Sequence, residues 1–160
     1  MVPGGNRNKG HDGEREVINL LKPMIDEIVG EGVLRRNLNQ SRQGGHDVAG
    51  LDFLAIEVKR CETLEIEKWW KQTLRQAEQA GGAIPVLIYR QNRKAWHVVM
   101  LGWVGMKMMR VTIGWEDFKE WLGEELRNRV RRGEIGVVSG FAKGATTVVV
   151  EGQGKGMATV

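Results

Sequence analysis

The chain has few of the residues that form disulfides or bind zinc. Cys61 is its only cysteine, which excludes an internal disulfide and a zinc cluster made from cysteines. Its three histidines, His11, His46 and His97, have no metal-ligand spacing among them. No glycine-rich phosphate loop follows a predicted strand, which argues against a nucleotide-binding module.

Long apolar runs are also missing. None reaches the roughly 18 residues of a membrane span, and residues 1–6 contain no apolar segment of the kind found in secretion signals. We therefore expect a soluble, cytoplasmic protein with no membrane partner. The formal net charge of +4 and the pI of about 9.4 favour a polyanionic partner.

The 160 residues suffice for one domain with a hydrophobic core. We expect this domain to occupy residues 1–132, with residues 1–9 flexible, and a glycine-rich extension with a strand or hairpin to occupy residues 133–160. Apolar periodicity predicts three helices, over residues 9–29, 64–79 and 115–131. Strands are predicted over residues 33–36, 47–49, 53–60, 84–89 and 96–101, with residues 47–49 and 53–60 forming a hairpin through Gly50.

An acidic pattern accompanies the strand at residues 53–60. Asp47 precedes the tetrapeptide Ile-Glu-Val-Lys by about ten residues, and strand alternation places Glu57 and Lys59 on one face. The first half of this strand is apolar on both faces, so the strand should be buried. Charged side chains in a buried strand cost free energy unless they are paired or bind a metal. Carboxylates beside an ammonium suit Mg²⁺ and a phosphodiester.

Glu14 supplies a third candidate acid from the first helix. At 100° per residue it lies in the middle of the apolar stripe, whereas Glu16 lies nearly opposite and should face solvent. The alternative is that both are acids favoured by the positive end of the helix dipole. That alternative does not explain the direction of Glu14.

The segment Lys9-Gly10-His11-Asp12-Gly13-Glu14-Arg15 resembles the Lys-Gly-x-x-x-Glu-Arg opening of archaeal-type Holliday junction resolvases. An Arg-rich strand, a Gly-Gly-x-Asp turn and the Ile-Glu-Val-Lys strand follow in that family's order. The wider group is the PD-(D/E)XK nuclease superfamily, and the resemblance covers roughly residues 8–100. It implies an α/β, restriction-endonuclease-like αβββαβ core with a mixed central sheet flanked by helices. The third helix and the tail lie outside it.

The resemblance also implies roles for individual residues. The candidate catalytic residues are Glu14, Asp47, Glu57, Lys59 and Gln72. The three acids and the Val58 carbonyl would bind one or two Mg²⁺ ions, for which Mn²⁺ can substitute. Gln72 is otherwise a surface glutamine. Phosphate contacts are expected from Lys9, Arg35, Arg36 and Arg42, of which the arginines are otherwise part of a solvated loop.

Six tryptophans are present, and we expect Trp69, Trp70, Trp96 and Trp103 in the core. The apolar residues 96–109 either fill a core against the third helix or form a dimer face. A four-way junction has near two-fold symmetry and needs two cuts, so we expect a homodimer with part of residues 96–109 in its interface.

The leading interpretation is a Mg²⁺-dependent endonuclease that resolves branched double-stranded DNA and leaves 5′-phosphate and 3′-hydroxyl ends. Similar small resolvases occur in bacteriophages, which would place the enzyme in the host cytoplasm. One alternative is a restriction-like, nicking or repair nuclease on ordinary duplex, although no recognition domain is visible. Another is a non-catalytic DNA-binding relic, which would have no reason to keep buried charges.

Overall fold

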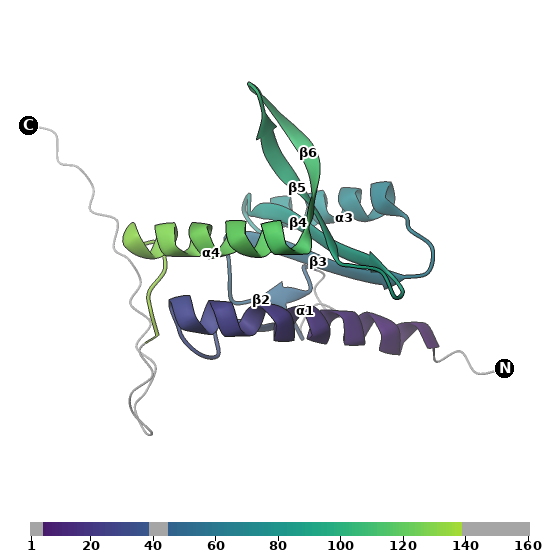
Figure 1. Cartoon of the computed structure of the whole chain (residues 1–160), viewed down its shortest axis with the longest axis horizontal. Helices are drawn as coiled ribbons and strands as arrows, with labels where there is room; N and C mark the ends of the chain where they lie inside the picture. Colours follow the sequence, from purple (N-terminus) through teal and green to yellow (C-terminus); the bar gives the residue numbers. More distant parts are fainter. Residues whose placement is uncertain (1–4, 39–44, 139–160) are drawn as a thin grey trace, which may run out of the picture.

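A computed structural model describes residues 5–38 and 45–138 of the chain (Figure 1). Labels follow Figure 1. The helices are α1 (Gly5–Val29), α3 (Ile66–Gln79) and α4 (Trp115–Arg131). The strands are β1 (Arg35–Arg36), β2 (Val48–Ala49), β3 (Leu54–Cys61), β4 (Ile84–Gln91), β5 (His97–Val104) and β6 (Lys107–Gly114). The chain therefore has the predicted α/β fold.

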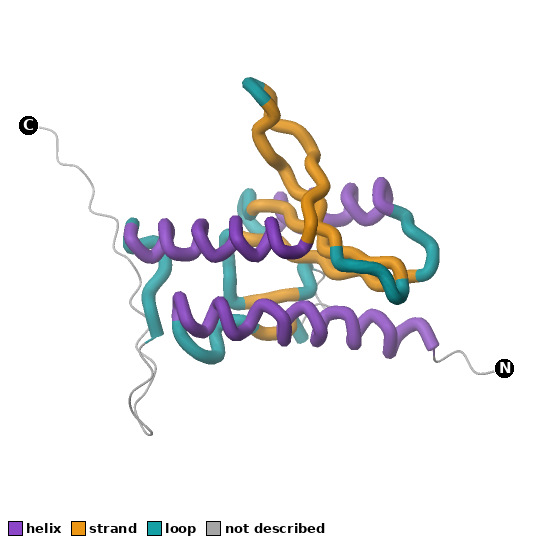
Figure 2. Tube along the Cα trace, viewed as in Figure 1, coloured by secondary structure: helices purple, strands orange, loops and turns teal. Residues whose placement is uncertain are grey.

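A mixed four-stranded sheet forms the middle layer. Its order is β3-β4-β5-β6, with β3 parallel to β4 and the remaining pairs antiparallel. Helices α1 and α4 lie side by side over one face, and α3 covers the other (Figures 1 and 2). Side chains of β3–β5 alternate between the two layers: Ile56 and Ile88 pack with α1 and α4, whereas Leu87 and Val99 pack with α3.

The predicted apolar stripe buries α1 against this sheet. Val17, Leu21, Ile25 and Val29 recur at spacings of four and are fully buried. The helix begins at Gly5, four residues earlier than predicted, so residues 5–9 are helical rather than a flexible leader. Of the helices that the structure describes, none combines the length and the apolar character needed to cross a bilayer.

The hairpin predicted between residues 47–49 and 53–60 is wrong. Strand β2 pairs antiparallel with β1 in a separate two-stranded sheet, not with β3. The chain does turn at Gly50, which has a φ of 107°. A Cβ there would lie 1.8 Å from the carbonyl oxygen of Val33, so this turn requires glycine.

Strand β6 was missed by the sequence analysis, and β5 extends beyond the predicted end at residue 101. Together they form a long hairpin whose far half projects from the body (Figures 1 and 2). Trp69, Trp70 and Trp96 are buried as predicted, but Trp103 lies on this projection and is 69% exposed. Its placement in the core was wrong because an apolar run fits an exposed ribbon as well as a buried strand.

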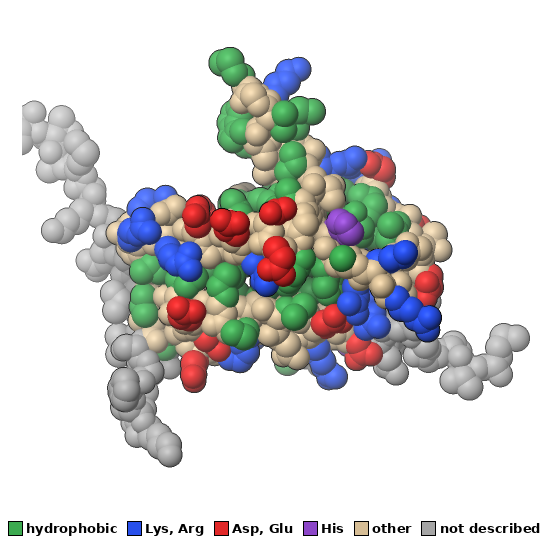
Figure 3. All heavy atoms as spheres, in the orientation of Figure 1, with side chains coloured by type: hydrophobic (Ala, Val, Ile, Leu, Met, Phe, Trp, Pro, Cys, Tyr) green, Lys and Arg blue, Asp and Glu red, His purple; other side chains and the backbone are tan. Residues whose placement is uncertain are grey.

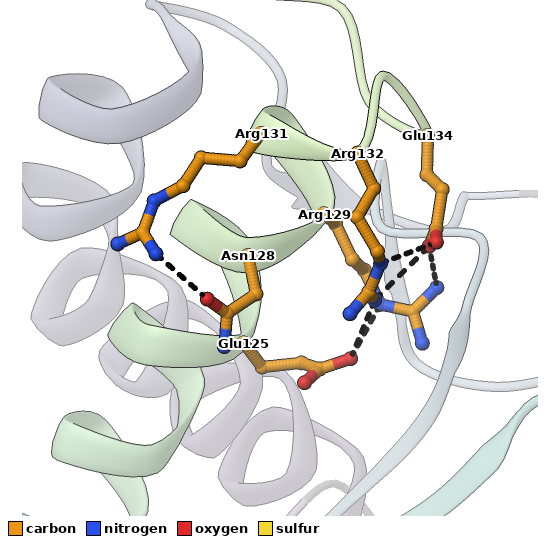
Figure 4. A network of polar contacts seen from close by, with 6 residues as sticks. All are labelled: Glu125, Asn128, Arg129, Arg131, Arg132 and Glu134. Carbon is orange, nitrogen blue, oxygen red and sulfur yellow. Dashed lines mark hydrogen bonds and ion pairs between the residues drawn. The ribbon is translucent and has the colours of Figure 1, made fainter.

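A polar network at the end of α4 directs the chain back toward α1 (Figure 4). Arg129 binds Glu125 at 2.7 Å and Glu134 at 3.0 Å, and Arg132 binds Glu134 at 2.6 Å. Beyond this network the Val138 amide donates to the Val29 carbonyl at 2.8 Å. The strand or hairpin predicted near residues 146–150 lies outside the described residues.

Candidate active site

One cavity of about 540 Å³ collects the acidic candidates at the carboxyl-terminal half of β3. It is lined by Glu14 from α1, Asp47 from the segment before β2, Glu57, Val58 and Lys59 from β3, and Gln72 from α3. The structure thus brings together six candidates from four separate segments of the chain.

Strand β3 is an outer strand of the sheet, and Asp47 binds to its free edge. The Asp47 amide donates to the Ile56 carbonyl at 2.8 Å, and the Val58 amide donates to Asp47 Oδ2 at 2.7 Å. The N–H and C=O of one strand residue point to the same edge, so the Val58 carbonyl also faces this side. The Asp47 carboxylate and the Val58 carbonyl, both expected to bind a metal, therefore lie at the same edge of β3.

Glu57 is the most deeply buried acid in the described part of the chain, with 1% of its surface exposed. Gln72 Nε2 donates to its Oε1 and Gln76 Nε2 to its Oε2, each at 2.9 Å, and Lys59 forms an ion pair with it. Gln76 also donates to the Gly45 carbonyl at 2.9 Å. Sequence analysis missed Gln76, although its spacing of four from Gln72 places both on one helix face.

Burial and mutual repulsion shape the electrostatics of the site. Burial, followed by the charge of Glu57, raises the pKa of Asp47 to about 7, with the Val58 amide acting in the opposite direction. For Lys59, burial opposes the charged form, but the charge and hydrogen bond of Glu57 outweigh it and raise the pKa. The ammonium group therefore stays charged beside two acids.

Glu14 reaches the cavity because α1 packs closely on β3. At buried Gly13, a Cβ would already lie 3.2 Å from Arg60 Cβ, so a small residue allows this approach. Glu14 Oε2 accepts a hydrogen bond from Arg36 Nε at 2.8 Å and forms an ion pair with Arg36 Nη2 at 2.7 Å. Arg36 does not line the cavity itself but binds Glu14, which does.

The other basic candidates are placed differently. Arg35 lines a second cavity of about 710 Å³, together with Phe53 and Arg129, and does not line the acidic cavity. Lys9 lies in α1, but its side chain is outside the described part of the chain, as is the whole of Arg42.

The prediction that Glu16 faces solvent was wrong, because protein side chains bind both of its carboxylate oxygens. Its Oε2 pairs with Arg90 at 2.6 Å, and its Oε1 accepts from Trp96 Nε1 at 3.2 Å. Arg60 Nη1 lies 3.8 Å away. Helical phasing failed here because Arg60 and Arg90, register partners on β3 and β4, reach the flank of α1 from the sheet.

A divalent cation fits the chemistry of these donors. Asp47 and Glu57 offer hard oxygen ligands, and their repulsion is the kind of strain that a bound cation relieves. Glu14 and Glu57 are meanwhile engaged by protein partners. Accordingly, no three Asp, Glu, His or Cys side chains in residues 5–38 and 45–138 form a ready-made ligand group.

Comparison with known proteins gives a family match. The sequence model of a family described as "Phage putative PDDEXK endonuclease" matches residues 5–120. No curated protein matches the chain. Among solved structures, Hjc, a Holliday junction resolvase from the archaeal hyperthermophile Archaeoglobus fulgidus, is similar over 70% of this chain and 96% of its own. The identity is 18% and the TM-score 0.43, too distant to assign a substrate.

Proposed function

The chain belongs to the phage PDDEXK endonuclease family, and from this premise we propose that it is a Mg²⁺-dependent endonuclease that cuts branched DNA. The observation that carries the proposal is that Asp47, Glu57 and Lys59 line one cavity beside β3. Hydrolysis of this kind leaves 5′-phosphate and 3′-hydroxyl ends. The proposed preference for Holliday junctions rests on the resemblance of residues 9–15 to the opening of archaeal-type Holliday junction resolvases.

In this proposal Asp47, Glu57 and the Val58 carbonyl hold the metal, and Glu14 completes the set. A bound Mg²⁺ lowers the pKa of an attacking water and neutralises charge on the scissile phosphate, and Mn²⁺ can take its place. Gln72 and Gln76 fix both oxygens of Glu57, so this carboxylate cannot rotate away from the cavity.

Two cations of the chain act on the phosphate. The raised pKa of Lys59 keeps its ammonium charged, so that it binds a non-bridging oxygen or orients the water. Arg36 holds Glu14 through Nε and Nη2, and its positive charge beside the cavity favours a phosphate there. Because a four-way junction needs two symmetric cuts, we propose that the enzyme works as a homodimer.

A cleavage assay on matched substrates tests the proposal. Labelled four-way junction, replication fork and linear duplex are incubated with Mg²⁺, Ca²⁺ or EDTA. We expect cutting with Mg²⁺, preference for the branched substrates, weak activity with Ca²⁺ and none in EDTA. Glu57→Gln should lower cleavage by orders of magnitude but retain binding, whereas the exposed Glu65→Gln should behave as wild type. Undiminished cutting in EDTA would refute the metal mechanism.

A further inference from the structure

The far half of the β5–β6 hairpin, residues 102–110, is an apolar ribbon that stands away from the body (Figures 1 and 3). Trp103 pairs with Met108 on one face, and Val104 pairs with Lys107 on the other. Met106 at the turn is 97% exposed. We call residues 102–110 the distal ribbon. Its apolar side chains lie on both faces and at the tip.

The charge of the hairpin points to an anionic partner. Residues 97–114 contain two cations, Lys107 and Arg110, and no Asp or Glu. Arg110 Nη2 binds Glu67 Oε1 of α3 at 2.6 Å, which ties the base of the distal ribbon to the body. Lys107 is exposed next to the tip. An anion that approaches the tip therefore meets a positive charge and no negative one from the hairpin.

The two-sided apolar character selects among anionic partners. A flat surface can cover one face of a two-stranded ribbon but leaves the other in water. A slot with two apolar walls covers both faces. The branch point of a DNA junction is such a slot, because base pairs at the ends of neighbouring arms can expose their flat faces.

We infer that the distal ribbon inserts at a DNA branch point, with Trp103 stacked on an exposed base pair and Lys107 on a nearby phosphate. The inference rests on the proposed function and adds a branch-binding element to it. Aromatic side chains stack on any base, and apolar wedges such as Met106 separate base steps without sequence preference. Recognition of the branch would thus depend on its structure alone.

The strand register gives the spacing between wedge and cut. Glu57 is level with Val99 across the sheet, and the turn at Gly105 lies six residues farther along β5. At about 3.3 Å per residue this is about 20 Å, the length of about six base pairs. We therefore expect cuts displaced from the branch by up to about six base pairs.

The test uses a variant with an altered distal ribbon, Trp103→Ala/Met106→Ala. Both side chains are exposed, so the fold should be unaffected. Leu20→Ala, an exposed apolar residue of α1, is the matched control. Binding to a four-way junction and to a linear duplex of equal length is measured in Ca²⁺, with 2-aminopurine beside the branch. We expect about tenfold weaker junction binding for the variant, unchanged duplex binding and loss of the fluorescence change at the branch.

Each outcome decides the inference. Unchanged junction binding, or equal losses on junction and duplex, would overturn it. Light scattering tests whether the distal ribbon binds a second copy of the chain instead of DNA. If the wild type is a dimer and the double variant is a monomer, the inference is wrong. If the wild type cuts branched DNA but the double variant shows no selective loss of junction binding, the inference is wrong and the proposed function stands. Selective loss of binding in a protein that cuts no DNA removes the proposed function alone.

Discussion

Replacing Asp47 by asparagine should stabilise the fold at alkaline pH, although it removes a proposed metal ligand. The pKa of Asp47 is about 7 in the folded chain, against 3.8 for an ordinary aspartate, because of burial and the nearby Glu57. Between pH 3.8 and about 7, Asp47 loses its proton in the unfolded chain but keeps it in the folded chain, so the free energy of unfolding falls as the pH rises. Above about pH 7 the acid is ionised in both states, and the loss of stability is complete. A difference of about three pH units corresponds to about 4 kcal/mol.

Asparagine resembles the protonated acid, so Asp47→Asn should raise the free energy of unfolding at pH 8.5 by up to about 4 kcal/mol. The gain should shrink toward zero near pH 4. Urea unfolding in EDTA, followed by tryptophan fluorescence, measures both values. Asp52→Asn, the same change at an exposed turn position, is the control. A gain equal at both pH values, or none at pH 8.5, would refute the electrostatic argument.

Three further predictions concern other charged side chains in and around the cavity. Glu16→Gln should lower stability by about 1–2 kcal/mol in urea and reduce cleavage, because it removes the partner of Arg90 and loosens α1; unchanged values would mean that this ion pair does not position the helix. Lys59→Ala should slow cleavage about 100-fold and weaken binding to uncut DNA, unlike a carboxylate variant, which should retain binding. Arg36→Ala should weaken binding and reduce the slope of affinity against salt by about one, whereas Arg35→Ala, at the second cavity, should change neither.

The main features of the site could be predicted because they depend on short-range patterns. An apolar run predicts strand β3, and the charged residues Glu57 and Lys59 interrupt the apolar pattern in its second half. The resemblance to resolvases then linked Glu14 and Asp47 to that strand. The structure places all four in one cavity, because α1 packs on β3 and Asp47 binds the outer edge of that strand.

Contacts between distant segments escaped prediction. Glu16 was placed by helical phase alone, which cannot show that Arg90, 74 residues away, approaches from the sheet. Gln76 was visible as a neighbour of Gln72, but its bond to Glu57 depends on how α3 packs on β3. The exposure of Trp103 could not be predicted because an apolar run indicates a strand but not what covers it.

The same electrostatics bears on the hypothesis of an idle DNA-binding relic. In the absence of metal, Asp47 and Glu57 repel one another in a buried cavity, and two glutamines and a lysine are needed to hold Glu57 in place. Negative charge at this position also opposes the binding of a phosphate backbone. A protein that only bound DNA would gain both stability and affinity from neutral side chains at these two positions. A protein that must hold a divalent cation against a phosphodiester needs both charges, and the arrangement around β3 favours that second case.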